Sequence, residues 1–177
     1  DLFWDGEGGG LFFSGRENER LLTGVKETYD GALPSGNSVA LLNLLRLGRL
    51  TGDGDMDKRA EELVRAFAGE IEKSPAGHTM MLVALDFYYG PTKELVIVGS
   101  PEDGDVRLMI EEARRGFRPN LVVLLRPPGV EGEEIVRLAP YTGPMKMEGG
   151  RATAYLCENF ACREPITDLE ELKRALA

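Results

Sequence analysis

Three carboxylic acids lie in two short, glycine-containing stretches of this sequence. Asp5 and Glu7 occur in "WDGEGGG", and Asp30 occurs in "YDGALPSGNS". Glycines let a backbone approach a ligand closely, and two neighbouring carboxyl groups can act as general acid and general base. Cleavage of a sugar glycosidic bond uses such a pair, one carboxyl protonated and one ionised. We therefore take Asp5, Glu7 and Asp30 as the candidate catalytic residues.

Four further side chains near these acids could hold a ligand. The rings of Trp4 and Tyr29 offer stacking faces, while Ser35 and Asn37 can hydrogen-bond hydroxyl groups. The same residues also have a purely structural interpretation. The two aspartates would then be turn residues, Ser35 and Asn37 would be helix caps, and Trp4 would belong to the core. Residue types alone leave both interpretations open.

Cys157 and Cys162, in "CENFAC", form a weaker candidate redox site. Cys157 is expected at the carboxyl end of a strand, the edge where open α/β sheets usually place their sites. The two thiols could be redox-active or could form a small disulfide. However, their spacing is not C-x-x-C, and no lysine or histidine adjoins Cys157 to lower its pKa. A buried strand cysteine and an inert loop cysteine is the favoured interpretation.

No metal or cofactor is expected. Two cysteines supply only half of a structural zinc site, and His78 is the only histidine, for which we expect a packed or capping role. The segment "GSPEDGD" follows a predicted strand and precedes a predicted helix, as a phosphate loop would. It has neither of the glycine patterns found in nucleotide-binding loops, so it is interpreted as a helix start.

Helical periodicity dominates residues 1–90. The pattern predicts a hairpin between the apolar triplets 2–4 and 11–13, followed by three antiparallel helices at 39–50, 56–71 and 80–89. The first of these helices is apolar on nearly all sides, so most of its surface should be packed. Ser38 or Asn37 is its expected N-cap, and Ser74-Pro75 is the expected start of the third helix.

Strand patterns appear in residues 91–177. The predicted elements are strands at 95–98, 121–125 and 152–157 and helices at 103–116 and 169–176. The first two strands and the intervening helix make a βαβ unit, and Thr167 with Glu170 forms a capping box for the last helix. Residues 131–138 fit a helix or a strand equally well. The fold class is therefore α+β: helical hairpins, then a small α/β segment.

The composition excludes several partner classes. With 30 acidic and 21 basic residues the formal net charge is -9, which argues against binding to nucleic acid or to an anionic membrane surface. No apolar run approaches the ~20 residues of a membrane span, and no secretory signal is visible. Two cysteines do not make a disulfide scaffold, so a cytoplasmic location is expected. The absence of an initial methionine suggests a piece of a longer protein.

Three long motifs, in this order, carry a family resemblance: "WDGEGGGLFFSG", "YDGALPSGNSVALLNLLRL" and "TAYLCENFACREPITD". They resemble the C-terminal part of the YyaL-like, spermatogenesis-associated family of thioredoxin-domain proteins. The resemblance implies an N-terminal thioredoxin-like domain followed by an α/α toroid, akin to those of six-hairpin glycosidases. This chain would then lack the thioredoxin-like domain and the first part of the toroid, and its two cysteines would not be the thioredoxin pair.

The resemblance also favours a ligand site, because loops at the mouth of such a toroid surround its cavity. In this interpretation Asp5 or Asp30 is the acid or base, Glu7 is its partner, and the ligand is sugar-like. Whether any reaction is catalysed stays open. The alternative is a non-catalytic interaction module that presents clients to the missing thioredoxin-like domain. Because an incomplete toroid would leave apolar helix surface unmatched, self-association is a further expectation.

Overall fold

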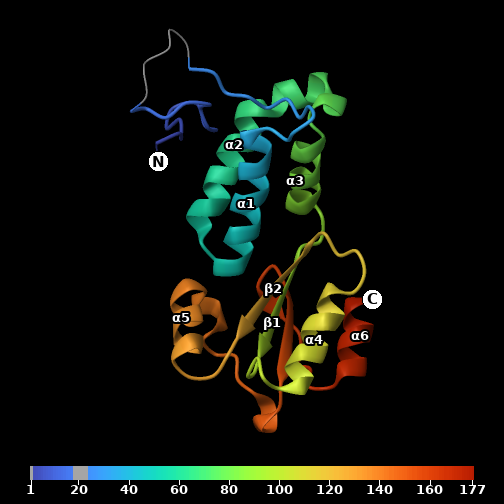
Figure 1. Cartoon of the computed structure of the whole chain (residues 1–177). Helices are drawn as coiled ribbons and strands as arrows, with labels where there is room; N and C mark the ends of the chain where they lie inside the picture. Colours follow the sequence, from blue (N-terminus) through green and yellow to red (C-terminus); the bar gives the residue numbers. More distant parts are fainter. Residues whose placement is uncertain (1, 18–23) are drawn as a thin grey trace. The chain divides into compact units, whose positions relative to one another are not determined.

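A computed structural model describes residues 2–17 and 24–177 (Figure 1). Within these residues it contains six α-helices, three short 3₁₀ turns and a four-stranded mixed sheet, which confirms the α+β class. The chain divides into two compact units. The first unit comprises Asp1–Gly48 and Asp53–Gly90, and the second comprises Arg49–Gly52 and Pro91–Ala177. In the described part of the chain, no helix is both long and apolar enough to cross a membrane.

The first unit consists of an N-terminal hairpin and three helices. Its helices are α1 (Gly36–Thr51), α2 (Gly54–Lys73) and α3 (Thr79–Tyr89), with the 3₁₀ turn η1 (Pro75–Gly77) before α3. The predicted hairpin is present: Trp4 and Leu11 form an antiparallel bridge, and the Phe12 N–H donates to the Phe3 carbonyl at 2.9 Å. The predicted start of the third helix at Ser74-Pro75 is wrong by one turn, because these residues form η1 and the α-helix begins only at Thr79.

Helix α2 shows why this unit packs. Its buried residues recur at intervals of three and four, which places them on one side of the helix: Ala60, Leu63, Phe67 and Ile71. Asp53 caps the helix by accepting a hydrogen bond from the Asp55 backbone N–H at 2.9 Å. Helix α1 buries less of its surface than its sequence suggests, since Val39 and Leu47 are exposed.

The second unit is built on a sheet with strand order β2-β1-β3-β4. The strands are β1 (Lys93–Val98), β2 (Leu121–Arg126), β3 (Thr153–Glu158) and β4 (Ala161–Cys162). β1 and β2 are parallel and connected through α4 (Gly104–Arg114), which confirms the predicted βαβ unit. β3 pairs antiparallel with β1, and β4 pairs antiparallel with β3. The ambiguous segment is a helix, α5 (Val130–Leu138).

The two faces of this sheet carry different cores. Alternate residues of β1, such as Leu95 and Ile97, face α4 and α6 (Leu169–Leu176), which lie side by side in Figure 1. The intervening residues, Val96 and Val98, pack on the other face with Met145 and with side chains of β3. Because side chains alternate along a strand, Glu94 lies on this second face as well.

The capping box predicted for α6 is wrong. Asp168, one residue later than Thr167, is the N-cap and accepts a hydrogen bond from the Glu171 N–H at 2.9 Å. The Asp168 carboxylate thus takes the capping role at the start of α6 that was expected of Thr167 and Glu170.

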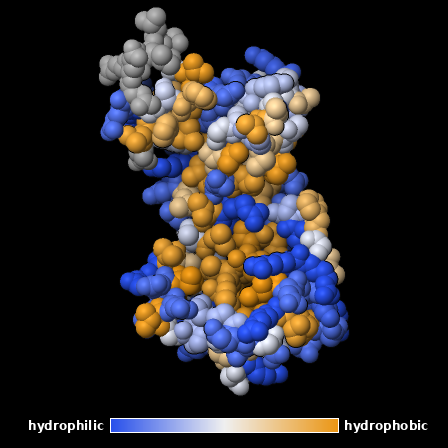
Figure 2. Space-filling model, in the orientation of Figure 1, coloured by the Kyte–Doolittle hydropathy of each residue, from blue (hydrophilic) through white to orange (hydrophobic). Residues whose placement is uncertain are grey.

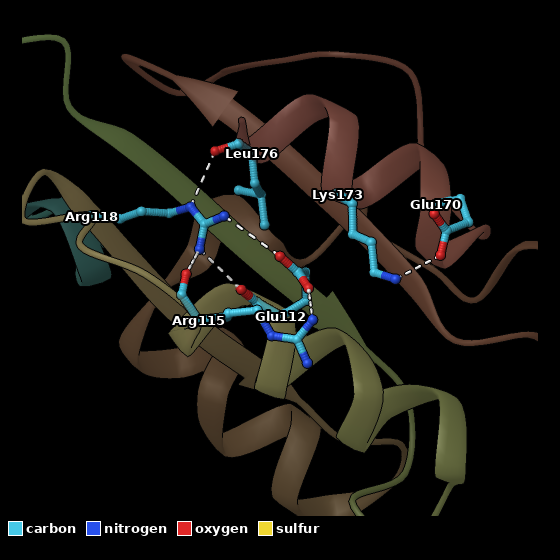
Figure 3. Close-up of polar contacts among 6 residues, drawn as sticks. All are labelled: Glu112, Arg115, Arg118, Glu170, Lys173 and Leu176. Carbon is cyan, nitrogen blue, oxygen red and sulfur yellow. Dashed lines mark hydrogen bonds and ion pairs between the residues drawn. The ribbon is translucent and has the colours of Figure 1, made fainter.

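One guanidinium joins the ends of α4 and α6 (Figure 3). Arg118 donates to the Leu176 carbonyl at 3.1 Å and to the Glu112 carbonyl at 3.0 Å, and also to the carbonyl of Arg115. Its Nη2 lies 3.5 Å from the buried Glu112 carboxylate. Because the last carbonyls of a helix have no partner within the helix, Arg118 satisfies acceptors at both helix ends.

Candidate functional site

The glycine-rich turn holds Asp5 in a fixed position. Its carboxylate lies 2.5 Å from the Lys26 ammonium and accepts a hydrogen bond from the Glu7 N–H at 3.0 Å. These interactions lower the pKa of Asp5 to about 2; the Lys26 hydrogen bond has the largest effect, followed by the N–H groups of Glu7 and Gly8. Lys26 also donates to the Gly9 carbonyl at 2.6 Å. Asp5 is therefore ionised and closes the turn onto Lys26.

Asn37 connects the start of α1 to two other segments. Its Oδ1 accepts the Leu11 N–H at 2.7 Å, while its Nδ2 donates to the carbonyls of Leu11 and Glu27, both at 2.9 Å. The side chain is buried. Its amide thus binds the backbone of the hairpin and of the segment before α1, which holds these two segments together at the start of α1.

Asp30 caps helix α3 from a distant part of the sequence. Its Oδ2 accepts the N–H groups of Met80 and Met81 at 2.8 and 3.1 Å, and its Oδ1 accepts the Ser35 N–H at 2.8 Å. Burial raises the pKa of Asp30, but hydrogen bonds from the N–H groups of Ser35 and Met81, the Ser38 hydroxyl and the Met80 N–H outweigh it and lower the pKa overall. A carboxylate at a helix N-terminus also interacts favourably with the helix dipole.

Ser35, and not Ser38 or Asn37, caps helix α1. Its hydroxyl accepts the Ser38 N–H at 3.1 Å and donates to the Ser38 hydroxyl at 2.8 Å. The predicted cap is therefore wrong, because the helix begins earlier than its apolar pattern does, at Gly36. Asp30 and Ser35 together fix the short segment that precedes α1, because Asp30 binds the start of α3 and Ser35 binds the start of α1.

A chain of polar contacts that the sequence did not reveal links the buried Thr28 and His78 to the exposed Glu70. The Thr28 hydroxyl donates to Glu70 Oε2 at 2.7 Å, and His78 Nε2 lies 3.3 Å from the same hydroxyl. His78 Nδ1 lies 2.8 Å from the Ser74 carbonyl. The packed role expected for the single histidine is confirmed, since both ring nitrogens contact the protein and the side chain is buried. Thr28 and Glu70 are 42 residues apart, so no local motif marks them.

The two predicted stacking residues have different surroundings. Trp4 is half-buried, and its ring lies beneath the Arg59 guanidinium, 5.6 Å from the ring centroid. Tyr29 is 63% exposed. It belongs to a pocket of about 510 Å³ lined by Phe13, Ser14, Val25, Lys26, Glu27, Thr28 and Tyr29. Phe13, 75% exposed, places a second aromatic ring at this pocket.

Glu7 lies in a separate pocket. This pocket, of about 330 Å³, is lined by Gly6, Glu7, Gly8, Gly9, Glu62, Arg65 and Ala66. The structure thus brings Glu7 together with a carboxylate and a guanidinium of α2. Asp5 and Asp30, by contrast, have separate sets of partners, namely Lys26 and the N-terminus of α3.

Cys157 and Cys162 are joined in a disulfide with an S–S distance of 2.05 Å. This corrects the interpretation of two separate cysteines: the side chains are directly opposite each other on β3 and β4, which places them within bonding range. Cys157 is buried, as expected for a strand cysteine, and Cys162 is exposed. Among the described residues, no group of three or more His, Cys, Asp or Glu side chains could hold a metal ion.

Comparison with known proteins identifies long relatives. No family model and no solved structure matches the chain. Human and rat spermatogenesis-associated protein 20 are each 36% identical to it over 176 residues, which cover 99% of this chain and 22% of the relative. An uncharacterised protein of Caenorhabditis elegans is 26% identical over 171 residues, 97% of this chain and 23% of that protein. The chain thus spans about a fifth of the length of the curated relatives it matches.

These similarities confirm the resemblance carried by the three sequence motifs. They extend over nearly the whole chain and include both the hairpin with its glycine-rich turn and the strands of the second unit. The chain matches the C-terminal part of the spermatogenesis-associated protein 20 family.

Proposed function

We propose that the first unit binds a sugar-like ligand in the pocket that contains Phe13 and Tyr29. The observation that carries this proposal is the presence of two exposed aromatic rings at one pocket of about 510 Å³. The apolar face of a sugar ring packs on such rings, while polar groups fix its hydroxyls. Ser14 and Glu27, which also line the pocket, supply a hydroxyl and a carboxylate for that purpose.

The protonation states favour binding over acid catalysis by Asp5 or Asp30. A general acid that acts near neutral pH needs a raised pKa, whereas the pKa of each of these carboxyl groups is lowered. Both are ionised and suit only the role of base or of structural anion. In an enzymatic version of the proposal, the acid would have to come from another group, and Glu7 with Glu62 in its pocket is the candidate pair.

Calorimetric titration of the chain with a panel of monosaccharides and sugar phosphates tests the proposal. Tyr29→Ala should weaken binding of any hit about tenfold, because burying an aromatic side chain contributes about 1.5–3 kcal/mol. Phe117→Ala is the control, since it removes an exposed aromatic ring from the second unit, away from this pocket. Binding that survives Tyr29→Ala, or is weakened equally by Phe117→Ala, would refute the assignment of this pocket.

The alternative function, a non-catalytic interaction module, is supported by apolar side chains on the surface of the first unit (Figure 2). The exposed ones in its N-terminal segments are Leu2, Phe3, Phe13, Val25 and Leu33. Contiguous exposed apolar side chains commonly mark protein-binding surfaces. An interaction module would bind no sugar in the titrations described above. It would instead bind an unfolded client protein, and this client would displace a fluorescent apolar dye from the surface of the first unit.

We further propose that α1–α3 form part of an α/α toroid, completed by the remaining length of the longer, cytoplasmic, thioredoxin-domain-bearing protein. Helices α1 and α2 are separated only by Gly52 and Asp53, which makes them an antiparallel hairpin of the kind a toroid repeats. Without that partner sequence, the exposed Val39 and Leu47 of α1 favour self-association. Light scattering should then show a mass that rises with concentration. A constant monomer mass would contradict this expectation.

A further inference from the structure

The disulfide of the second unit lies at the edge of the sheet, in a tight hairpin. Cys157 on β3 pairs directly with Cys162 on β4, and Asn159 and Phe160 form the two-residue turn with positive φ angles of 51° and 61°. Cys157 is only 1% exposed, whereas Cys162 is exposed on the last strand of the sheet. Of the two bonded residues, Cys162 is therefore the one that a reactant in solution can approach, while Cys157 is buried.

The strand register places an acidic residue, Glu94, directly opposite the buried Cys157. Glu94 on β1 is the direct partner of Cys157, which is in turn the partner of Cys162. Residues directly opposite each other on antiparallel strands project from the same face, with Cβ atoms about 4.5–5.5 Å apart. Glu94, Cys157 and Cys162 thus form one row across three strands, and Glu94 is completely buried.

The surroundings of Glu94 favour its protonated form. Burial has the largest effect and raises the pKa of Glu94. The Phe160 N–H, 3.2 Å from Oε2, and the Arg49 guanidinium, 3.4 Å from Oε1, lower this pKa without cancelling the effect of burial. The nearby charge of Glu158 raises it further. The pKa of the Tyr141 phenol is raised to about 12, first by burial and then by the charge of Glu94.

We propose that Cys157–Cys162 is an exchangeable disulfide, reduced by a dithiol that attacks Cys162, and that Glu94 donates a proton to Cys157 as the bond breaks. The substrate class is a small or protein-borne dithiol. Nothing in the proposed sugar site is required, because all participating residues belong to the second unit.

The exchange balances as follows. A thiolate of the dithiol attacks Cys162 Sγ, a new S–S bond forms there, and the Cys157–Cys162 bond breaks with its electron pair on Cys157 Sγ. That sulfur takes the proton of the Glu94 carboxyl group. The second thiolate of the reductant then attacks its own mixed disulfide and releases the Cys162 thiolate, which takes a proton from water. Two electrons pass from the dithiol, which becomes a disulfide, to the two cysteines.

Proton donation at this position addresses the costly part of the reaction. The leaving thiolate of Cys157 would form in an apolar environment, among Val96, Tyr155 and Met145, where an unpaired charge is strongly disfavoured. Proton transfer from a neutral Glu94 moves the developing negative charge from Cys157 to the Glu94 carboxylate, which the Arg49 guanidinium and the Phe160 N–H stabilise. In the reverse direction the Glu94 carboxylate removes the proton from the Cys157 thiol.

The test is the rate at which dithiothreitol reduces the full chain under native conditions, measured by acid quenching, thiol labelling and mass spectrometry. Each rate constant is divided by the concentration of the thiolate form of dithiothreitol, so that ionisation of the reductant does not affect the comparison. The measurements run from about pH 5 to about pH 8, where a glutamate with an ordinary pKa is already ionised. For the wild type, this constant should fall as pH rises through the pKa of Glu94. Glu94→Gln should give a pH-independent constant, about tenfold or more below the wild type at the acidic end.

Glu158→Gln is the matched control, because it removes an exposed carboxyl group next to Cys157 and should keep the falling profile. Identical profiles for the wild type and Glu94→Gln would overturn the role of Glu94. A second measurement needs no variant: the wild-type rate should rise in proportion to dithiothreitol concentration. A rate that becomes independent of that concentration would mean that unfolding precedes reduction, and would overturn the exchangeable disulfide itself.

Discussion

Replacing Asp30 by alanine should destabilise the first unit by about 3 kcal/mol. The carboxylate accepts three backbone N–H groups, those of Ser35, Met80 and Met81. A hydrogen bond to a charged group contributes about 1.5–3 kcal/mol, and part of that total is offset by the burial of the charge. Asp30→Asn keeps an acceptor oxygen but turns an NH₂ group toward N–H donors, so a smaller loss of about 1–2 kcal/mol is expected.

The pH dependence of this loss has a defined sign. Because the folded-state pKa of Asp30 lies below its unfolded value of about 3.9, its stabilisation is present above that value and is lost as pH falls through the folded pKa. The difference between wild type and Asp30→Asn should therefore be constant near neutral pH and shrink below about pH 4.

Urea denaturation followed by tryptophan fluorescence measures these differences. Trp4 is the only tryptophan of the chain and lies in the first unit, so its emission reports on that unit. Glu72→Gln, on the exposed side of α2, is the control and should change stability by less than about 0.5 kcal/mol. If Asp30→Ala matched this control, or if the loss were equally large at pH 3, the assignment of Asp30 as the cap of α3 would be wrong.

Three further substitutions test the geometry around the glycine-rich turn. Lys26→Met should raise the pKa of Asp5 from about 2 toward the ordinary 3.8, as followed by NMR titration of the carboxyl carbon. Gly10→Ala should destabilise the first unit by about 2–4 kcal/mol, because φ is +79° and a Cβ would lie 2.7 Å from a buried ring of α2. Gly6→Ala is the control and should be tolerated, since a Cβ there would have no atom within 4 Å. Asn37→Ala should cost about 2–3 kcal/mol in urea denaturation, since three backbone groups lose their partner.

The sequence predicted the elements of this chain better than the ends of those elements. Apolar periodicity located the helices of the first unit and the βαβ connection of the second, because burial on one side is what stabilises each of them. Capping was predicted poorly, since it depends on individual hydrogen bonds. The N-cap of α1 is Ser35 and that of α6 is Asp168, each one to three residues from the position that the local pattern favoured.

The candidate site shows the same limit more clearly. Residue types singled out polar side chains in the loops as site candidates, but the groups that these side chains bind are remote in sequence. Asp30 binds the start of α3, about 50 residues later, and Asn37 binds the hairpin, 26 residues earlier. Glu94 had no local signal at all, because its proximity to Cys157 follows only from the pairing of β1 with β3. These relations depend on tertiary structure and are invisible to a local pattern.

The strand order of the second unit has a consequence for biosynthesis. β1 lies between β2 and β3, yet it leaves the ribosome before either neighbour. Its pairing with β3 joins residues that are far apart in the sequence, such as Lys93 and Glu158. At the usual elongation rate of about 5–20 residues per second, β3 follows β1 after roughly 3–13 s. Throughout that interval, an apolar strand has an unpaired edge on a nascent chain, which is a template for aggregation. The βαβ unit, complete about 30 residues after β1 begins, is therefore expected to form first and to protect one edge of β1 until the hairpin of β3 and β4 is synthesised.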